Sequence, residues 1–289
     1  MSAPTIARQP GVRDTAVFYL GTHQPGWLTK AGVPLFISHR RLAGYRRLPR
    51  ARAGWALDSG GFSELSMFGE WHTTPAAYVT AVDRYDRQIG QLRWAAPQDW
   101  MCEPFVLTKT GLTVAEHQRR TVANFLELRE LWSRRQAAAA PHRRPCPFIP
   151  VLQGWTVEDY WRCADLYDRA GVHLAGYPLV GLGSVCRRQA TGEIGLIVRS
   201  LGQTLPLHGF GCKTAGLARY GRWLASADSM AWSVAGRRAP GCAPGHRSEA
   251  NCLPYALTWR DRVAAALAAS EQHEQLDLFA EPSPRIEVA

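Results

Sequence analysis

The chain has 289 residues, of which 46% are hydrophobic, so it can bury the core of one large α/β barrel or of two smaller domains. No run of about 18 apolar residues occurs, which excludes a transmembrane helix, and residues 1–14 lack the apolar core of a signal peptide. We therefore expect a cytoplasmic protein whose seven cysteines are thiols or metal ligands rather than disulfides. A net charge of +10, mostly from arginine, suits a polyanion such as nucleic acid, although a compositional bias toward arginine would give the same charge.

Short apolar segments of strand character recur along the chain, with helical patterns between most of them. The predicted strands are 16–22, 33–38, 55–59, 93–99, 148–152, 174–182, 205–211 and 227–233. Apolar residues at helical spacing predict helices over 75–89, 113–135, 156–170, 192–201 and 215–224. This alternation indicates a parallel sheet, and eight units in this length indicate a single α/β domain of the (β/α)8 TIM-barrel type.

The barrel is expected to span residues 15–269, with a small Cys/His loop inserted near its end. Residues 1–14 are expected to form a flexible N-terminus. Residues 270–289 are polar and contain prolines, so we expect a disordered C-terminal tail there.

Acidic residues and glycines stand where the predicted strands end. Asp58, Ser59 and Gly60 follow the third strand, and the polar or glycine residues at later strand ends are Asp99, Gln153, Gly154, Gly181, Gly183 and Asp228. An ordinary turn explains any one of them. The carboxyl ends of barrel strands build the active site, however, so their repetition indicates one common site. Asp228 lies within an apolar segment, where an acid is costly to bury unless it is used.

The order of these motifs over residues 16–257 resembles the tRNA-guanine transglycosylase superfamily. The matching motifs are Asp58-Ser-Gly-Gly-Phe62, Asp99 ahead of Cys102-Glu103, Val151-Leu-Gln153-Gly154, Leu179-Val-Gly181-Leu-Gly183 and Asp228-Ser-Met. Within the superfamily the chain is most similar to the DNA-directed DpdA branch, which inserts 7-deazaguanines into DNA. Members that act on tRNA usually carry Gln where Ser63 stands here, and the glycine-rich loop ends in Arg187 and Arg188. Both departures favour DNA.

The resemblance implies a base exchange through a covalent glycosyl-enzyme, with a 7-deazaguanine such as the 7-cyano form replacing guanine. Asp228 would be the nucleophile at C1′, and Asp58 would handle the proton of the departing and arriving bases. The residues that would bind the base are Ser59, Gly60, Asp99, Gln153, Gly154, Gly181 and Gly183. A double displacement at C1′ needs one ionised carboxylate and a second group that exchanges a proton, which fits this division of roles.

Three other functions stay open at this stage. The chain could be a tRNA-guanine transglycosylase, or an N-glycosidase in which water resolves the intermediate. It could also be a non-catalytic barrel that binds nucleic acid, which the presence of both Asp58 and Asp228 disfavours. If DNA is the substrate, the target base must be flipped out or met in a single strand. The residues expected to hold phosphates are Arg187, Arg188, Lys213, Arg237 and Arg238.

A tight loop after Asp228 carries possible metal ligands. Cys242, His246 and Cys252 lie close in sequence, with Glu249 as a conceivable fourth ligand. Relatives acting on tRNA carry a zinc site at this place. Structural zinc takes four protein ligands, usually Cys and His. The Cys and His residues of this loop are one short of four, and we predict a structural zinc ion from this incomplete set. The alternative is a Gly/Pro-rich loop with two buried thiols.

Aromatic side chains near the predicted site have two interpretations. Trp100 and Trp155 would either sandwich the base or pack in the core. His208 lies within an apolar strand, and this pattern favours a core histidine over a catalyst.

The tail contains Gln275-Leu-Asp-Leu-Phe279, two leucines and a phenylalanine in polar surroundings. These five residues resemble the peptide by which bacterial replication and repair enzymes bind the sliding clamp. The alternative is a last helical turn that packs on the domain.

Overall fold

The computed structural model describes residues 16–139, 141–186, 188, 191–212, 214–243 and 245–279, with side chains as far as residue 268. Eight strands form one parallel sheet within these residues. The strands are β1 Val17–Thr22, β2 Leu35–Ser38, β3 Trp55–Asp58, β4 Leu92–Ala95, β5 Val151–Leu152, β6 Val180–Leu182, β7 Leu207–Gly209 and β8 Leu224–Ser229. The predicted N-terminus, residues 1–14, lies outside the described part of the chain.

The sheet curls until its two edge strands approach each other. Its order is β4-β3-β2-β1-β8-β7-β6-β5, so β4 and β5 are the edges. A parallel bridge joins Ala95 to Phe148, just ahead of β5. The N–H of Ala95 donates to the carbonyl of Pro147 at 2.8 Å, and the N–H of Ile149 donates to the carbonyl of Ala95 at 3.2 Å. The predicted α/β barrel class is confirmed.

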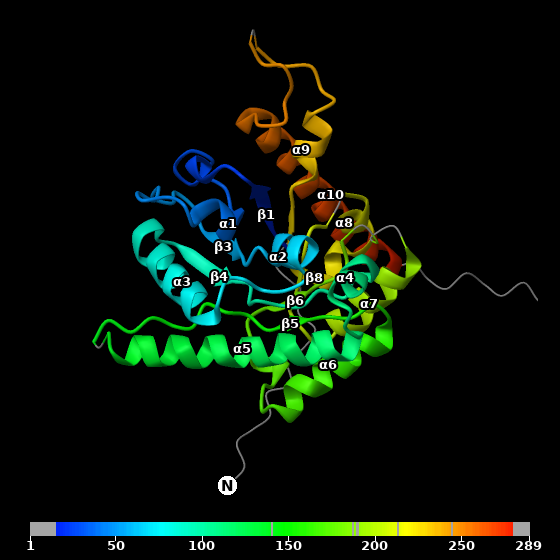
Figure 1. Cartoon of the computed structure of the whole chain (residues 1–289). Helices are drawn as coiled ribbons and strands as arrows, with labels where there is room; N and C mark the ends of the chain where they lie inside the picture. The colour runs from blue at the N-terminus through cyan, green and yellow to red at the C-terminus, as the bar shows by residue number, and fades with distance from the viewer. Residues whose placement is uncertain are drawn as a thin grey trace, which may run out of the picture.

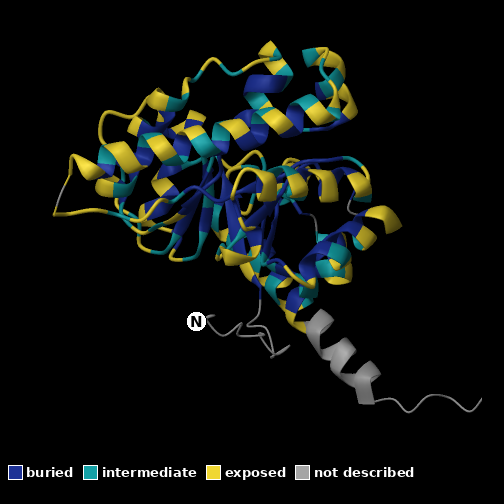
Figure 2. Cartoon of the chain, turned by 90° about the horizontal axis from the view of Figure 1, so that it is seen from below, coloured by how far each residue is buried: buried dark blue, intermediate teal, exposed yellow. Residues whose placement is uncertain are grey.

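Helices surround the curled sheet (Figure 1). Their bounds are α1 His39–Leu42, α2 Gly61–Phe68, α3 Pro75–Ile89, α4 Pro104–Thr110, α5 Val114–Ala137, α6 Val157–Arg169, α7 Gly192–Gly202, α8 Thr214–Tyr220, α9 Ala231–Gly236 and α10 Leu253–Phe279, with 3-10 turns η1 Pro25–Thr29, η2 Leu174–Gly176 and η3 Gly221–Trp223. Figure 2 shows the strands as buried and the outer faces of the helices as exposed. No described helix combines the length and the apolarity needed to cross a membrane.

Alternation along the strands separates two layers of core. Phe18, Leu20 and Leu57 belong to the large cluster that packs between strands and helices. Tyr19 and Ala56, one position away, belong to a smaller cluster on the other face of the sheet, inside the barrel. Because successive side chains of a strand point to opposite faces, every second position faces the interior. This alternation decides which polar residues reach the site.

The helices that begin with a side-chain cap start within one residue of the predicted positions. Thr74, Thr113 and Thr156 accept a backbone N–H at the starts of α3, α5 and α6, and Thr156 and Asp159 form a capping box. The predicted strand over 227–233 differs, because β8 ends at Ser229 and α9 begins at Ala231. Its apolar residues after Ser229 fit a buried helical turn as well as a strand.

The last helix enters the segment predicted to be disordered. Backbone residues 270–279 are the end of α10, which fits their good helix formers, Glu, Gln and Leu. Residues 280–289 lie outside the described part of the chain. The side chains of Gln275–Phe279 also lie outside it, so binding to the sliding clamp stays a prediction.

Candidate active site

Asp58 is the last residue of β3 and lies on the interior side of the sheet, in phase with Ala56. Burial raises the pKa of its carboxyl, opposed by hydrogen bonds from the Gly60 N–H and the Ser38 hydroxyl, and the nearby charge of Asp228 raises it further. Gly60 has φ of +86°, a backbone conformation that glycine adopts without strain, and this turn brings its N–H to the carboxylate. Asp58 can therefore carry a proton at a higher pH than a solvated Asp.

Asp228 lies near the end of β8 and is 6% exposed. Its Oδ1 accepts the N–H of Gly211 at 3.0 Å and lies 3.3 Å from Nε2 of His208. Both donors come from β7 or the turn after it. The buried acid is therefore held by specific donors, as a buried carboxylate requires.

One cavity of about 540 Å³ joins the two carboxylates. Its lining includes Asp58, Asp228, Ser38, Phe62, Arg41 and Met230. Ser38 ends β2, while Phe62 and Met230 follow β3 and β8, so the cavity opens where the strands end. Arg40 also lines it and forms an ion pair with Glu64 at 3.3 Å. The predicted location at the carboxyl ends of the strands agrees with this arrangement.

Asp99, Gln153, Ser184 and Glu103 form a chain of polar contacts near Asp58. The Gln153 amide donates to Asp99, and the Ser184 hydroxyl lies 2.6 Å from Gln153 Oε1 and 2.8 Å from Glu103 Oε2. Burial raises the pKa of Asp99 to about 7, against the hydrogen bond from Gln153, and the charges of Asp58 and Glu103 contribute. These four residues are not part of the cavity lining, and their contacts hold the Gln153 amide in one orientation.

The glycines of the motifs make room for these polar side chains. A Cβ on Gly183 would lie 2.2 Å from the Gln153 amide nitrogen, and a Cβ on Gly154 would lie 2.7 Å from Cβ of Asp159. Asp159 in turn accepts the N–H groups of Trp155 and Thr156. Gly183 therefore leaves room for the Gln153 amide, and Gly154 leaves room for Asp159 at the start of α6.

The residues predicted to hold phosphates lie in different surroundings. Arg237 and Arg238 are exposed after α9. Arg188 is buried, with its guanidinium 3.7 Å from the ring centre of Trp155 and an ion pair to Glu193 at 2.5 Å. Arg187 and Lys213 lie outside the described residues.

Trp100 and Trp155 are both covered by arginine side chains. Arg120 lies over the Trp100 ring at 4.6 Å, and Trp100 packs with Leu65 and Val106 in a small cluster. Trp155 carries Arg188 on its face. Trp100 therefore packs in the core, whereas Trp155 is half-buried beneath Arg188.

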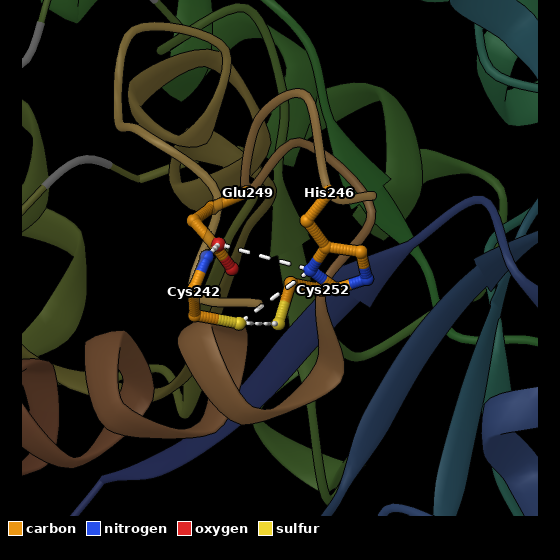
Figure 3. A group of neighbouring side chains, drawn as sticks. All are labelled: Cys242, His246, Glu249 and Cys252. Atoms are coloured by element: carbon orange, nitrogen blue, oxygen red, sulfur yellow. Dashed lines mark hydrogen bonds and ion pairs between the residues drawn. The ribbon is translucent and has the colours of Figure 1, made fainter. Parts of the chain in front are cut away.

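The predicted metal ligands converge (Figure 3). The ligand atoms of Cys242, His246, Glu249 and Cys252 all lie within 4.8 Å of one another. The two sulfurs are 3.7 Å apart, and the Cys242 sulfur is 3.5 Å from His246 Nδ1. Tetrahedral zinc, with bonds of about 2.3 Å to sulfur and about 2.0 Å to nitrogen, requires about 3.8 Å and about 3.5 Å for these separations. Glu249 Oε2 is buried without a hydrogen-bond partner among the described residues, as a fourth ligand would be. The residues fit a zinc ion.

Several residues of the site were not predicted from the sequence. His208, Ser226, Ser184 and Glu103 contact site residues directly. In the structure His208 faces the interior, since its neighbours Leu207 and Gly209 face outward. For all four residues only the tertiary contact reveals the role.

The fold is a parallel α/β barrel with two buried carboxyl groups where its strands end, the face at which barrels of this class carry their sites. The chain belongs to the DpdA family: residues 15–281 match the family model described as DeoxyPurine in DNA protein A. Comparison with curated proteins found no match. The family is implicated in 7-deazaguanine modification of DNA, so DNA is the substrate class that membership implies.

Proposed function

We propose that the protein is a DNA-guanine transglycosylase, which exchanges guanine in DNA for a 7-deazaguanine such as the 7-cyano form. The observation that carries the proposal is the shared cavity of Asp58 and Asp228 in a barrel of the DpdA family. Two carboxyl groups with different surroundings can divide the work of a double displacement at C1′.

In the first step, Asp228 attacks C1′ and the bond from C1′ to N9 of guanine breaks. The bonding electrons leave with the base, which takes the proton of Asp58. In the second step, ionised Asp58 removes the N9 proton of the incoming deazaguanine. N9 then attacks C1′ and releases the Asp228 carboxylate. Burial raises the pKa of Asp58, which suits the group that carries the proton, while the hydrogen-bonded Asp228 suits the nucleophile.

The base is proposed to bind beside Asp99 and Gln153. Guanine offers an N1–H and an exocyclic amine, which a carboxylate accepts, while the second amide hydrogen of Gln153 can donate to O6. Ser59, Gly60, Gly154, Gly181 and Gly183 complete the proposed base-binding set. Ser59 is 3% exposed, so its contribution would come from the backbone turn that it shares with Gly60.

DNA is the proposed polymer, and its target base must leave the stack to reach the cavity. Arg41 is exposed and lines the cavity, and Arg237 and Arg238 are exposed after the strand of Asp228. Together with the net charge of +10, these side chains provide phosphate contacts.

The proposal is tested by incubating the protein with labelled guanine and either duplex DNA, single-stranded DNA or tRNA. We expect label in DNA and none in tRNA. Label in tRNA alone would identify a tRNA-guanine transglycosylase. Abasic sites without uptake of label would identify an N-glycosidase, and neither product would overturn the catalytic proposal.

We further propose that Cys242, His246, Glu249 and Cys252 hold a structural zinc ion. Bound zinc would supply ligand bonds that fix this loop between α9 and α10. The loop follows the strand of Asp228, so fixing it would also support the cavity wall at Met230.

Removing one zinc ligand is expected to remove the metal and lower the stability. The Cys252→Ser protein should contain less than about one tenth of the zinc of the parent and melt several degrees lower, because metal-binding energy is part of the folding energy. Elemental analysis and thermal denaturation measure both. Cys146→Ser is the control, since Cys146 lies far along the chain, after α5. Equal zinc in the parent and Cys252→Ser would contradict the site.

A further inference from the structure

His208 lies inside the barrel and contacts Asp228. Its Nδ1 lies 2.8 Å from the Ser226 hydroxyl, and its Nε2 lies 3.3 Å from Asp228 Oδ1. Ser226 and Asp228 are two positions apart on β8, so both side chains face the interior and reach the same imidazole. All three residues are buried.

The partners of the imidazole define which nitrogen carries the hydrogen. A carboxylate only accepts, so Nε2 must carry the hydrogen that binds Asp228, and Nδ1 then accepts the Ser226 hydroxyl. Burial lowers the pKa of His208, against the hydrogen bond and charge of Asp228. His208 is thus a neutral donor.

Aromatic rings hold the imidazole in place. The ring centres of Trp94, Phe210, Phe36 and Tyr19 lie 4.5, 4.7, 5.8 and 6.1 Å from that of His208. A side chain enclosed in this way has one accessible rotamer, so its hydrogen bond has a fixed direction. Gly211 donates to the same oxygen from the turn after β7.

We propose that His208 is a positioning residue for the nucleophile: with Gly211 it anchors Oδ1 of Asp228, so that Oδ2 attacks C1′. This inference rests on the proposed function, because it assigns the two oxygens of the proposed nucleophile.

The test compares His208→Phe with His208→Gln. Phe keeps a planar ring but offers no donor, whereas Gln offers an amide hydrogen. We expect His208→Phe to slow formation of the covalent DNA adduct by about 10²-fold in single turnover, as misplacement of a reacting group does, without changing DNA affinity. His208→Gln should recover most of the rate.

His117→Phe is the matched control for the loss of a buried imidazole. His117 is equally buried and has contacts to Thr110 and the Met101 carbonyl, away from Asp228. Its substitution should leave the rate of adduct formation unchanged. A rate in His208→Phe equal to that of the parent would overturn the positioning role, as would a folded His208→Gln no faster than His208→Phe.

Failure of the proposed function gives a different result, because the parent itself would then form no adduct and exchange no guanine. Nitrogen NMR of the labelled parent tests the arrangement without any activity or variant. We expect neutral His208 with its hydrogen on Nε2 at pH 7. A hydrogen on Nδ1 would overturn the inference.

Discussion

The Asp228→Asn protein is expected to fold normally and to lose guanine exchange by about 10⁴-fold or more, the scale seen when a covalent nucleophile is removed. An amide is a poor nucleophile and cannot balance the positive charge that develops at C1′. Its Oδ1 can still accept from Gly211 and His208, so the local structure should persist. Uptake of labelled guanine into DNA measures the loss.

A denaturing gel gives the companion measurement. The parent should form a DNA adduct that survives denaturation, and Asp228→Asn should form none. Asp165→Asn, at an exposed position on α6, is the control and should match the parent. Adduct or exchange by Asp228→Asn at the parental level would remove Asp228 from the mechanism.

The part of this site that could be predicted from sequence is the part encoded locally. Asp58 is followed at once by its glycine turn, and Cys242, His246 and Cys252 lie within one short loop, so residue types and spacing were informative. Helices with a threonine cap were likewise predictable, since the cap and its backbone partner lie three residues apart.

The remainder depends on contacts between distant segments. Ser184 meets Glu103 and Gln153 only because β6 lies next to β5 and the loop after β4 folds across them. Both faces of the strands are buried, so hydrophobic alternation does not show which face is interior. His208 could therefore not be assigned to Asp228 until the register of β7 with β8 was known. The short helices α2 and α4 were missed because 8 and 7 residues carry too little helical pattern.

Replacing Asp58 by Asn is expected to slow guanine exchange by about 10² to 10⁴-fold, the usual contribution of a general acid or base. Asn keeps the shape of the side chain but cannot carry the proton between the two bases. DNA affinity should stay close to that of the parent, because Asn keeps the size of the side chain and leaves the exposed arginines unchanged. Equal losses of affinity and exchange would assign Asp58 a structural role.

Thermal denaturation tests whether Asp58 has a structural role. Folding raises the pKa of Asp58 and lowers that of Asp83, so the two carboxyl groups change the stability with pH in opposite directions. Burial raises the pKa of Asp58, so its ionised form opposes folding as pH rises from the unfolded toward the folded pKa, and Asn removes this penalty. Burial also acts against ionisation of Asp83, but Arg135, Arg144 and Arg87 outweigh it and lower its pKa. Asp83 therefore adds stability above its unfolded pKa that is lost at low pH. At pH 8, Asp58→Asn should melt at or above the parental temperature, and Asp83→Asn below it.

The proton-transfer role of Asp58 has a specific chemical rescue. A 7-methylguanine in DNA carries a positive charge and departs as a neutral base without taking up a proton. Asp58→Asn should therefore form the covalent adduct with 7-methylguanine DNA at nearly the parental rate, while remaining slow with guanine DNA. Asp228→Asn should form no adduct with either substrate, because a better leaving group does not replace a missing nucleophile. If 7-methylguanine fails to rescue a folded Asp58→Asn that binds DNA, then Asp58 does not act by donating a proton to the departing base.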